Sequence, residues 1–336
     1  MLPGKVPADV LGRVIFAHLG KEDRNLLLGP AIGEDASLIR IGDAILVAAT
    51  DPITGSVEDI GWLAVHINAN DVATFGVRPQ WFLASIMLPS GFQEAELRRI
   101  MIQIHEAALA LDITVAGGHT EITEGIDRPI IAGFMMGVTA ENRYVTSSGA
   151  KPGDIIIMSK TAAIEGTAIL AAEGEPVLSE RLSAQILDEA LSLRSQISVV
   201  EDGIIAFETG QITAMHDPTE GGILGGLHEI CDASQVGFEI NLDSIAIHEA
   251  TSAICDVLSV NALELISSGC MLMTSTPKGA ESVVAALEAR GIRATILGKI
   301  SSEASVRKGT RNGESRQMHR PKNDAIWDAL KKLKQT

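Results

Sequence analysis

Residues 59–66 read Asp59-Ile60-Gly61-Trp62-Leu63-Ala64-Val65-His66, and residues 70–79 read Asn70-Asp71-Val72-Ala73-Thr74-Phe75-Gly76-Val77-Arg78-Pro79. The apolar part, Trp62–Phe75, has the length of a helix. Asp71 lies inside this apolar stretch. A carboxylate among apolar side chains needs an ionic partner or a bound cation, so Asp71 is a candidate cation ligand.

Strand-length apolar runs and segments of helical period alternate on both sides of this stretch. In Glu94–Leu111, apolar residues recur at intervals of three and four, which is typical of an amphipathic helix. The alternation predicts a mixed α/β fold. The runs that we expect to form strands are Ala44–Thr50, Ile130–Val138, Ile155–Met158 and Met271–Thr274.

A chain of 336 residues is long enough for about two domains. Turn-forming residues at Gly149–Asp154 separate two strand-like runs near its middle, which predicts a boundary there. We therefore expect an N-terminal domain at residues 1–148 and a C-terminal domain at residues 149–305. Residues 306–336 would form a basic tail.

The tail differs from the rest of the chain in charge. Residues 301–336 hold nine Lys and Arg against four Asp and Glu. We expect a loop at Arg307–Gly313 and an amphipathic closing helix at Asp324–Lys334. The basic residues could form a solvated face or dock an anionic partner.

The composition excludes several classes of function. The formal charge is -16, with one Tyr and three Trp, so a nucleic-acid partner is not expected. No apolar run approaches the roughly 18 residues of a membrane span, and we expect a soluble, cytoplasmic protein. Cys231, Cys255 and Cys270 are widely spaced and include no C-x-x-C pair, which fits neither a disulfide framework nor a zinc site. We therefore expect them to be buried, reduced thiols.

Common catalytic motifs are absent from the sequence. No two glycines are separated by a single residue, which excludes G-x-G-x-x-G, and Leu227 stands where a P-loop at Gly221–Gly226 needs lysine. H-E-x-x-H and G-x-S-x-G do not occur either.

Four aspartates lie where elements are expected to begin or end, or inside an apolar helix. They occur in Gly33-Glu34-Asp35-Ala36, Thr50-Asp51-Pro52, Asn70-Asp71 and His216-Asp217-Pro218-Thr219-Glu220-Gly221-Gly222. Carboxylates that converge from different elements suit Mg²⁺ together with substrate phosphates. The alternative is that Asp35 and Asp217 only form turns or cap helices, and that Asp51 merely follows a strand.

The pair Gly117-Gly118 follows the expected strand Ile113–Ala116 and precedes His119. Adjacent glycines let backbone N–H groups approach an anion, although a plain tight turn explains them equally well. A lone histidine such as His119 is more often structural than catalytic.

Taken in order, these segments resemble the AIR synthase-related superfamily. Its members include aminoimidazole ribonucleotide synthetase, thiamine-monophosphate kinase, selenophosphate synthetase and the hydrogenase-maturation carbamoyl dehydratase. The likeness is greatest to the hydrogenase-maturation branch, through residues 59–71, the run Glu165–Ala172 and the Asp-Pro-Thr-x-Gly-Gly turn.

The resemblance implies an α/β (α+β) fold of two domains. The N-terminal mixed sheet with helices pairs with that of a second subunit, which makes a homodimer, and the C-terminal α/β domain covers the cleft. ATP and Mg²⁺ lie between the domains. By the same likeness, Asp35, Asp51, Asp71 and Asp217 bind the metal. The residues implied to line the nucleotide are Thr50, Asn70, Gly117, Gly118, Thr120 and Glu121.

Several departures from the family bear on function. The hydrogenase-maturation proteins end in a tail whose terminal Cys accepts the carbamoyl group, whereas the last cysteine here is Cys270. Selenophosphate synthetase has a reactive residue near its N-terminus, whereas no cysteine precedes Cys231. Glu220 replaces a basic residue that is common in the late turn of the hydrogenase-maturation proteins.

Two functional hypotheses remain open. In the first, an ATP-dependent enzyme transfers the γ-phosphoryl group to an oxygen of a small-molecule or protein-bound acceptor, or activates that oxygen. Asp51, Asp71 and Asp217 would carry catalysis, and His119 or Glu121 would orient the acceptor or take its proton. In the second, the chain is a scaffold that binds nucleotide or a protein partner without turnover.

Overall fold

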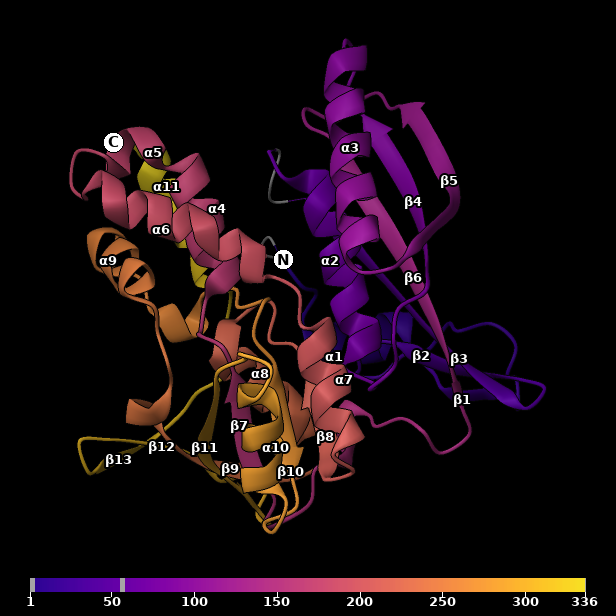
Figure 1. Ribbon diagram of the computed structural model, residues 1–336, viewed down its shortest axis with the longest axis vertical. Coiled ribbons are helices and arrows are strands. Elements are labelled where there is room, and N and C mark those ends of the chain that lie inside the picture. The colour runs from indigo at the N-terminus through magenta and orange to yellow at the C-terminus, as the bar shows by residue number, and fades with distance from the viewer. Residues whose placement is uncertain (1–3, 55–57, 336) are drawn as a thin grey trace. The chain divides into compact units, whose positions relative to one another are not determined.

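The computed structural model describes residues 4–54 and 58–335, and they form two compact units (Figure 1). The N-terminal unit comprises Asp23–Gly29 and Asp35–Tyr144. The C-terminal unit comprises the chain up to Glu22, the segment Pro30–Glu34, and the chain from Val145 onward. The C-terminal unit is therefore built from three separate stretches of sequence.

The N-terminal unit contains a six-stranded sheet in the order β1-β2-β3-β6-β4-β5. Strands β4 and β5 are parallel, and the other neighbours are antiparallel, so the sheet is mixed as expected. Its strands are β1 (Leu26–Leu28), β2 (Ser37–Ile41), β3 (Ala44–Ile53), β4 (Trp81–Leu88), β5 (Thr114–Ile122) and β6 (Ile130–Ala140).

Helices α2 (Ile60–Ala73) and α3 (Glu94–Ala110) cover one face of this sheet. Nearly every residue of α2 is buried, because the helix lies between the sheet and α3. Gly133 and Gly137 of β6 face α2, and an added Cβ on Gly137 would lie 3.0 Å from Val72. These glycines let the helix pack directly on the strand.

The C-terminal unit contains a seven-stranded sheet in the order β13-β12-β9-β11-β7-β10-β8. All neighbours are antiparallel except β12 and β9. Its strands are β7 (Ile155–Ser159), β8 (Ile212–His216), β9 (Gly237–Asn241), β10 (Leu272–Ser275), β11 (Ala294–Ser301), β12 (Arg307–Arg311) and β13 (Glu314–Gln317).

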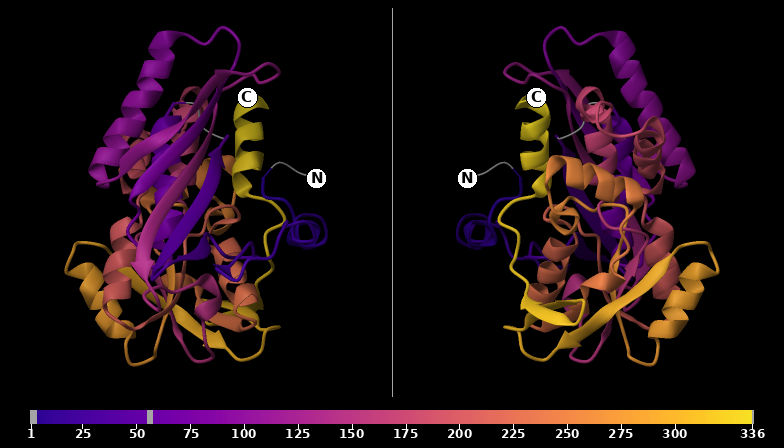
Figure 2. Two further views of the ribbon diagram at one scale, coloured as in Figure 1. Left: turned by 90° about the vertical axis from the view of Figure 1, so that its right-hand side faces the viewer. Right: turned by 90° about the vertical axis from the view of Figure 1, so that its left-hand side faces the viewer.

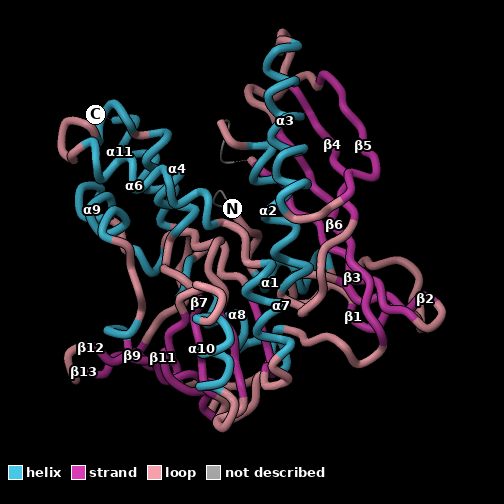
Figure 3. The backbone as a smooth tube through the Cα atoms, in the orientation of Figure 1, coloured by secondary structure: helices cyan, strands magenta, loops and turns pink. Residues whose placement is uncertain are grey.

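Helices cover both faces of the second sheet (Figure 3). Helix α8 (Gly222–Ala233) packs on the face that carries Ile156 and Met158 of β7, and α7 (Val200–Glu208) and α10 (Ala280–Glu288) pack on the face of Ile157. A further apolar cluster joins helices α4, α6, α9 and α11. The remaining helices are α1 (Ala8–Val10), α4 (Ile164–Glu173), α5 (Glu175–Leu178), α6 (Ala184–Ser192), α9 (Glu249–Leu258) and α11 (Ala325–Gln335).

Three local expectations are wrong. The expected loop at Arg307–Gly313 is the hairpin β12–β13, which pairs in parallel with β9 through its first strand. Strand β3 does not end at Thr50 but continues to Ile53, with Asp51 still paired to Gly133. Strand β5 continues through Gly117 and Gly118, so no turn or anion-binding nest forms there.

The expectations about membrane spans and about the cysteines can be compared with the described residues. No helix in the described ranges has the length and apolar character needed to cross a membrane. Cys231, Cys255 and Cys270 are buried and unpaired in disulfides, as expected. Burial raises the pKa of Cys231 and of Cys255 to about 12 and that of Cys270 further. None of the three is a reactive thiolate at neutral pH.

Candidate functional site

Asp51 lies near the end of β3, where a side chain of α2 and the backbone of β6 hold the strand. Asn68 on α2 accepts a hydrogen bond from the Asp51 N–H at 2.8 Å and donates one to the Asp51 carbonyl at 3.2 Å. The Thr50 hydroxyl donates to the Gly133 carbonyl at 2.8 Å. These bonds hold Asp51, which is partly buried, in a fixed backbone position at this end of the strand.

Asp71 and Asn70 occupy the last turn of α2. Asn70 is fully buried and Asp71 is 5% exposed. The Thr74 hydroxyl donates to the Asp71 carbonyl at 2.7 Å and so helps to close the helix. Burial of this carboxylate inside an apolar helix agrees with the sequence pattern that singled it out.

Gly117, Gly118, His119, Thr120 and Glu121 are exposed along the edge strand β5. The carboxylate of Glu121 is held by Thr123, whose hydroxyl donates at 2.8 Å, and by His119 Nε2 at 3.2 Å. These two bonds lower the pKa of Glu121, the one from Thr123 more strongly. His119 and Glu121 are thus adjacent on one face of the strand, open to a ligand.

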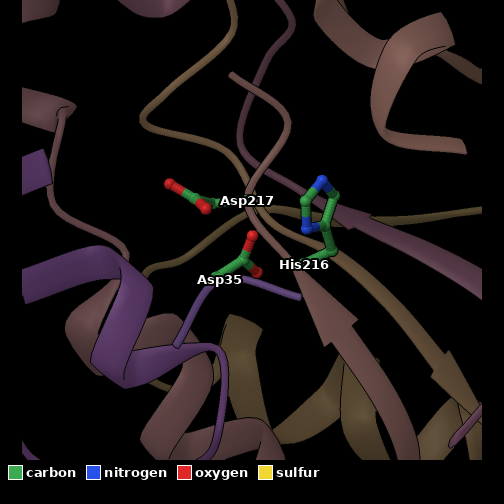
Figure 4. Close-up of side chains that lie close together, drawn as sticks. All are labelled: Asp35, His216 and Asp217. Carbon is green, nitrogen blue, oxygen red and sulfur yellow. The ribbon is translucent and has the colours of Figure 1, made fainter. Parts of the chain in front are cut away.

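His216 and Asp217 lie at the end of β8, just before the turn that begins α8 (Figure 4). Both are 1% exposed. The turn closes with a hydrogen bond from the Gly222 N–H to the Thr219 carbonyl at 3.0 Å. Gly221 precedes the helix in the left-handed conformation, with φ of 84°, which explains a glycine at this position.

Asp35 directly follows Glu34, whose carboxylate accepts the N–H groups of Ser147 and Ser148 at 3.1 and 3.0 Å. His216 and Asp217 each offer one possible metal-ligand atom, and these two atoms lie within 4.8 Å of each other (Figure 4).

Glu229 on α8 was not predicted from the sequence. It accepts a hydrogen bond from His216 Nε2 at 2.9 Å, and Arg320 approaches its other oxygen at 3.7 Å. Burial alone would raise the pKa of Glu229, but the charge of Lys5, the bond from His216 and the charge of Arg320 bring it to about 2. Glu229 therefore stays ionised and fixes the imidazole of His216. Only the fold reveals the pair, since the two residues are 13 positions apart.

Two arginines of the expected basic tail form ion pairs within the C-terminal unit. Arg307 is 7% exposed, donates to the Val236 carbonyl at 2.6 Å and pairs with Asp232 at 2.6 Å. Arg320 approaches Asp232 at 3.5 Å. The positive charge of these two arginines thus balances acidic residues of α8.

Comparison with family models assigns both halves of the chain. Residues 33–139 match the model for the N-terminal domain of AIR synthase related protein, and residues 151–308 match the model for its C-terminal domain. The chain belongs to the AIR synthase-related family. The resemblance inferred from the ordered motifs is therefore confirmed.

Proteins similar to this chain include members of the hydrogenase-maturation branch. The chain is 29% identical over 315 residues to the putative hydrogenase expression/formation protein MJ0676 of Methanocaldococcus jannaschii. The aligned region covers 89% of each protein. It is 28% identical over 280 residues to carbamoyl dehydratase HypE of Rhizobium leguminosarum bv. viciae, covering 81% of this chain and 78% of that one.

Solved structures share the fold. HypE from a HypE–HypF complex matches with a TM-score of 0.76 at 22% identity, covering 93% of this chain and 99% of that one. HypE in complex with ATP matches with a TM-score of 0.73 at 22% identity, and the match covers 96% of this chain and 97% of that one. AaThiL complexed with AMPPCP and TMP matches with a TM-score of 0.72 at 19% identity, and the match covers 96% of this chain and 99% of that one. The expected two-domain AIR synthase-like fold is confirmed, and the named relatives include enzymes, as predicted.

Proposed function

We propose that this protein binds Mg²⁺–ATP and transfers the γ-phosphoryl group to an oxygen of an acceptor, or activates that oxygen. The buried carboxylate of Asp217, at the start of a hydrogen-bonded turn after β8, is the observation on which this rests. The relatives add support, because HypE has been solved with ATP and AaThiL with AMPPCP.

The donor set fits a hard divalent cation. Carboxylates such as those of Asp35 and Asp217 supply oxygen ligands, which Mg²⁺ prefers, and His216 is engaged by Glu229. In the proposed site, Asp35, Asp51, Asp71 and Asp217 bind the metal. When bound, Mg²⁺ would neutralise charge on the phosphates. The chain itself positions the carboxylates through Asn68 and the turn after β8.

Residues of β3, α2 and β5 would face the nucleotide and the acceptor. In this proposal, Thr50, Asn70, Gly117, Gly118 and Thr120 line the nucleotide. His119 and Glu121 are joined by a hydrogen bond, so together they can orient a hydroxyl or take its proton.

The three cysteines are unsuited to carry the transferred group. All three are buried, and their raised pKa values leave almost no thiolate at neutral pH. We propose that the acceptor oxygen belongs to a small molecule or to a protein-bound group rather than to one of these residues.

A second candidate function is that of a nucleotide-binding maturation protein that acts through a protein partner without turnover. The observation that favours it is the solved HypE–HypF complex, whose HypE chain shares this fold. Steady release of ADP in the presence of an acceptor mixture would exclude it.

We also propose that the N-terminal unit forms a homodimer through the face of its sheet opposite α2 and α3. The left view of Figure 2 shows the strands of this sheet with no helix from the described part of the same unit in front of them. On β6 and β4 the outward positions include Phe134, Val138 and Trp81, which are 43%, 38% and 39% exposed. Large exposed apolar side chains on a sheet, together with the edge strand β5, are typical of a surface that a second copy covers.

The experiment that tests the proposed function is titration calorimetry of ATP with and without Mg²⁺, on the wild type, on Asp71→Asn and on Asp217→Asn. We expect micromolar binding that requires Mg²⁺ and is lost in both variants. Asp127→Asn is the matched control, since Asp127 is exposed and pairs only with its neighbour Arg128 in the contacts found here. Binding of equal strength in all four proteins would refute the proposed site.

A further inference from the structure

We propose that Asp324 is a positioning residue for the site that contains Asp217. This inference rests on the proposed function. Asp324 immediately precedes α11, more than a hundred positions from Asp217 in the sequence. It would act by fixing the backbone of the turn Asp217–Gly222.

The carboxylate of Asp324 joins three parts of the C-terminal unit. Its Oδ2 accepts the Gly221 N–H at 2.6 Å, and its Oδ1 accepts the N–H groups of Ile326 at 2.8 Å and Ile266 at 3.2 Å. Asp324 is 3% exposed. A buried carboxylate that accepts three backbone N–H groups is a rigid junction, because each lost bond would leave a buried donor unsatisfied.

The bond to Gly221 bears directly on the candidate site. Gly221 lies four residues after Asp217, in the left-handed conformation that ends the turn and begins α8. An added Cβ on Gly222 would lie 2.6 Å from the Leu265 carbonyl, so the turn also packs closely on the segment that carries Ile266. Asp324 therefore connects the turn to the same segment against which the turn packs.

The other side of the turn is held by Lys5. Its backbone N–H donates to Glu220 Oε2 at 2.7 Å, and its ammonium donates to the Thr219 hydroxyl at 2.9 Å. Two segments far apart in sequence, at Lys5 and at Asp324, thus contact consecutive residues of one turn. The contact of Asp324 is the more constrained of the two, because its carboxylate is buried and accepts three backbone N–H groups.

A helix cap alone does not account for this arrangement. Serine would satisfy the Ile326 N–H as well as aspartate does, since both are good capping residues. Only a side chain with two acceptor oxygens reaches Gly221 and Ile266 while it caps α11. The carboxylate is therefore suited to holding the turn in addition to beginning the helix.

The test uses the full chain and compares Asp324→Ser with Asp324→Asn. Serine keeps the cap of α11 and loses the bond to Gly221, and asparagine places a donor amide against one of the N–H groups. Calorimetry of ATP measures the Mg²⁺ concentration that gives half-maximal binding, well below the unfolding temperature of each variant. We expect that concentration to rise at least about tenfold in both variants, as for the loss of a partner behind a metal ligand.

Asp328→Asn is the matched control, because Asp328 is on the same helix, exposed, and pairs only with Lys331 in the described contacts. It should leave the Mg²⁺ dependence unchanged. If Asp324→Asn does not fold, Asp324→Ser decides alone.

The outcomes separate this inference from the proposed function. Wild-type Mg²⁺ dependence in a folded Asp324→Ser, with binding lost in Asp217→Asn, overturns the role of Asp324 only. Unchanged binding in Asp217→Asn overturns the proposed function itself. Weakening of ATP binding to the same extent with and without Mg²⁺ shows a general structural role for Asp324 and also overturns the inference.

Discussion

Asn68 and Asp51 are joined by two hydrogen bonds, one in each direction, between a side chain of α2 and the backbone of β3. Asn68 also donates to the Ala64 carbonyl one turn earlier on its own helix, at 2.9 Å. The pair therefore fixes the end of one strand relative to the helix that carries Asp71.

Replacing Asn68 should affect both stability and binding. Asn68→Ala leaves the partly buried Asp51 N–H without its acceptor, so we expect the free energy of unfolding to fall by about 1–3 kcal/mol. Mg²⁺–ATP binding should weaken as well, because Asp51 loses its fixed position. Urea unfolding and calorimetry measure the two effects. The exposed Asn25→Ala serves as the control, and an Asn68→Ala protein with unchanged stability would contradict the interpretation.

The two glycines of β5 should differ in their tolerance of a side chain. Both have φ near 155°, but an added Cβ on Gly118 would overlap the Ala84 carbonyl oxygen, whereas on Gly117 its nearest neighbour is Leu83 at 3.8 Å. Gly118→Ala should therefore lower the melting temperature by several degrees more than Gly117→Ala. Because the two share the same backbone conformation, the difference isolates the steric clash. Equal effects would argue against the close approach of β4 and β5.

His228 should make stability depend on pH. Burial, followed by the charge of Arg307, lowers its pKa from an ordinary value of 6.5 to about 4. Between these values the unfolded chain binds more protons than the folded one, so this contribution is complete above pH 6.5 and is lost as the pH falls to 4. It amounts to at most about 3 kcal/mol.

The measurement for His228 is the slope of unfolding free energy against pH, compared with that of His228→Asn. The comparison is needed because Asp324, whose pKa is raised by burial to about 6, has the opposite slope over much of this range. The variant should show a smaller gain in stability between pH 4 and pH 6.5 than the wild type. Exposed Asn25→Ala, which removes no titratable group, should keep the wild-type slope, and an unchanged slope in His228→Asn would contradict the prediction.

The proposed dimer can be disrupted from the open face of the first sheet. Phe134→Glu places a charge in the centre of that face and should convert the protein to a monomer, as measured by light scattering at micromolar concentration. Ile102→Glu, at a 48% exposed position on α3, is the control and should remain dimeric. A wild-type protein that is monomeric at the same concentration would refute the proposed dimer.

The sequence predicted the parts of the fold that local patterns determine. The helices at residues 60–73 and 94–110 and the strands around Ile130 and Ile155 follow from apolar spacing. The hairpin β12–β13 was missed because its charged, polar residues read as a loop, although β12 gains its stability by pairing with β9. Gly117 and Gly118 were taken for a turn because the sequence alone does not show that β4 approaches closely enough to exclude a side chain.

Among the site residues, Asp71 and Asp217 were identifiable because each is charged in an apolar or turn context. Glu229, Asp324 and Asn68 were not, since their importance comes from partners that are distant in sequence. The sequence placed Asp324 at the first position of the expected helix Asp324–Lys334 and did not indicate its bonds to Gly221 and Ile266.

The burial of the three cysteines makes this chain convenient for spectroscopy. Since Cys231, Cys255 and Cys270 are shielded and mostly protonated at neutral pH, a cysteine introduced on the surface would react much faster with a maleimide dye than they do. A single label on each unit could thus be attached without first removing native thiols. Energy transfer between two such labels would then report the separation of the units during nucleotide binding.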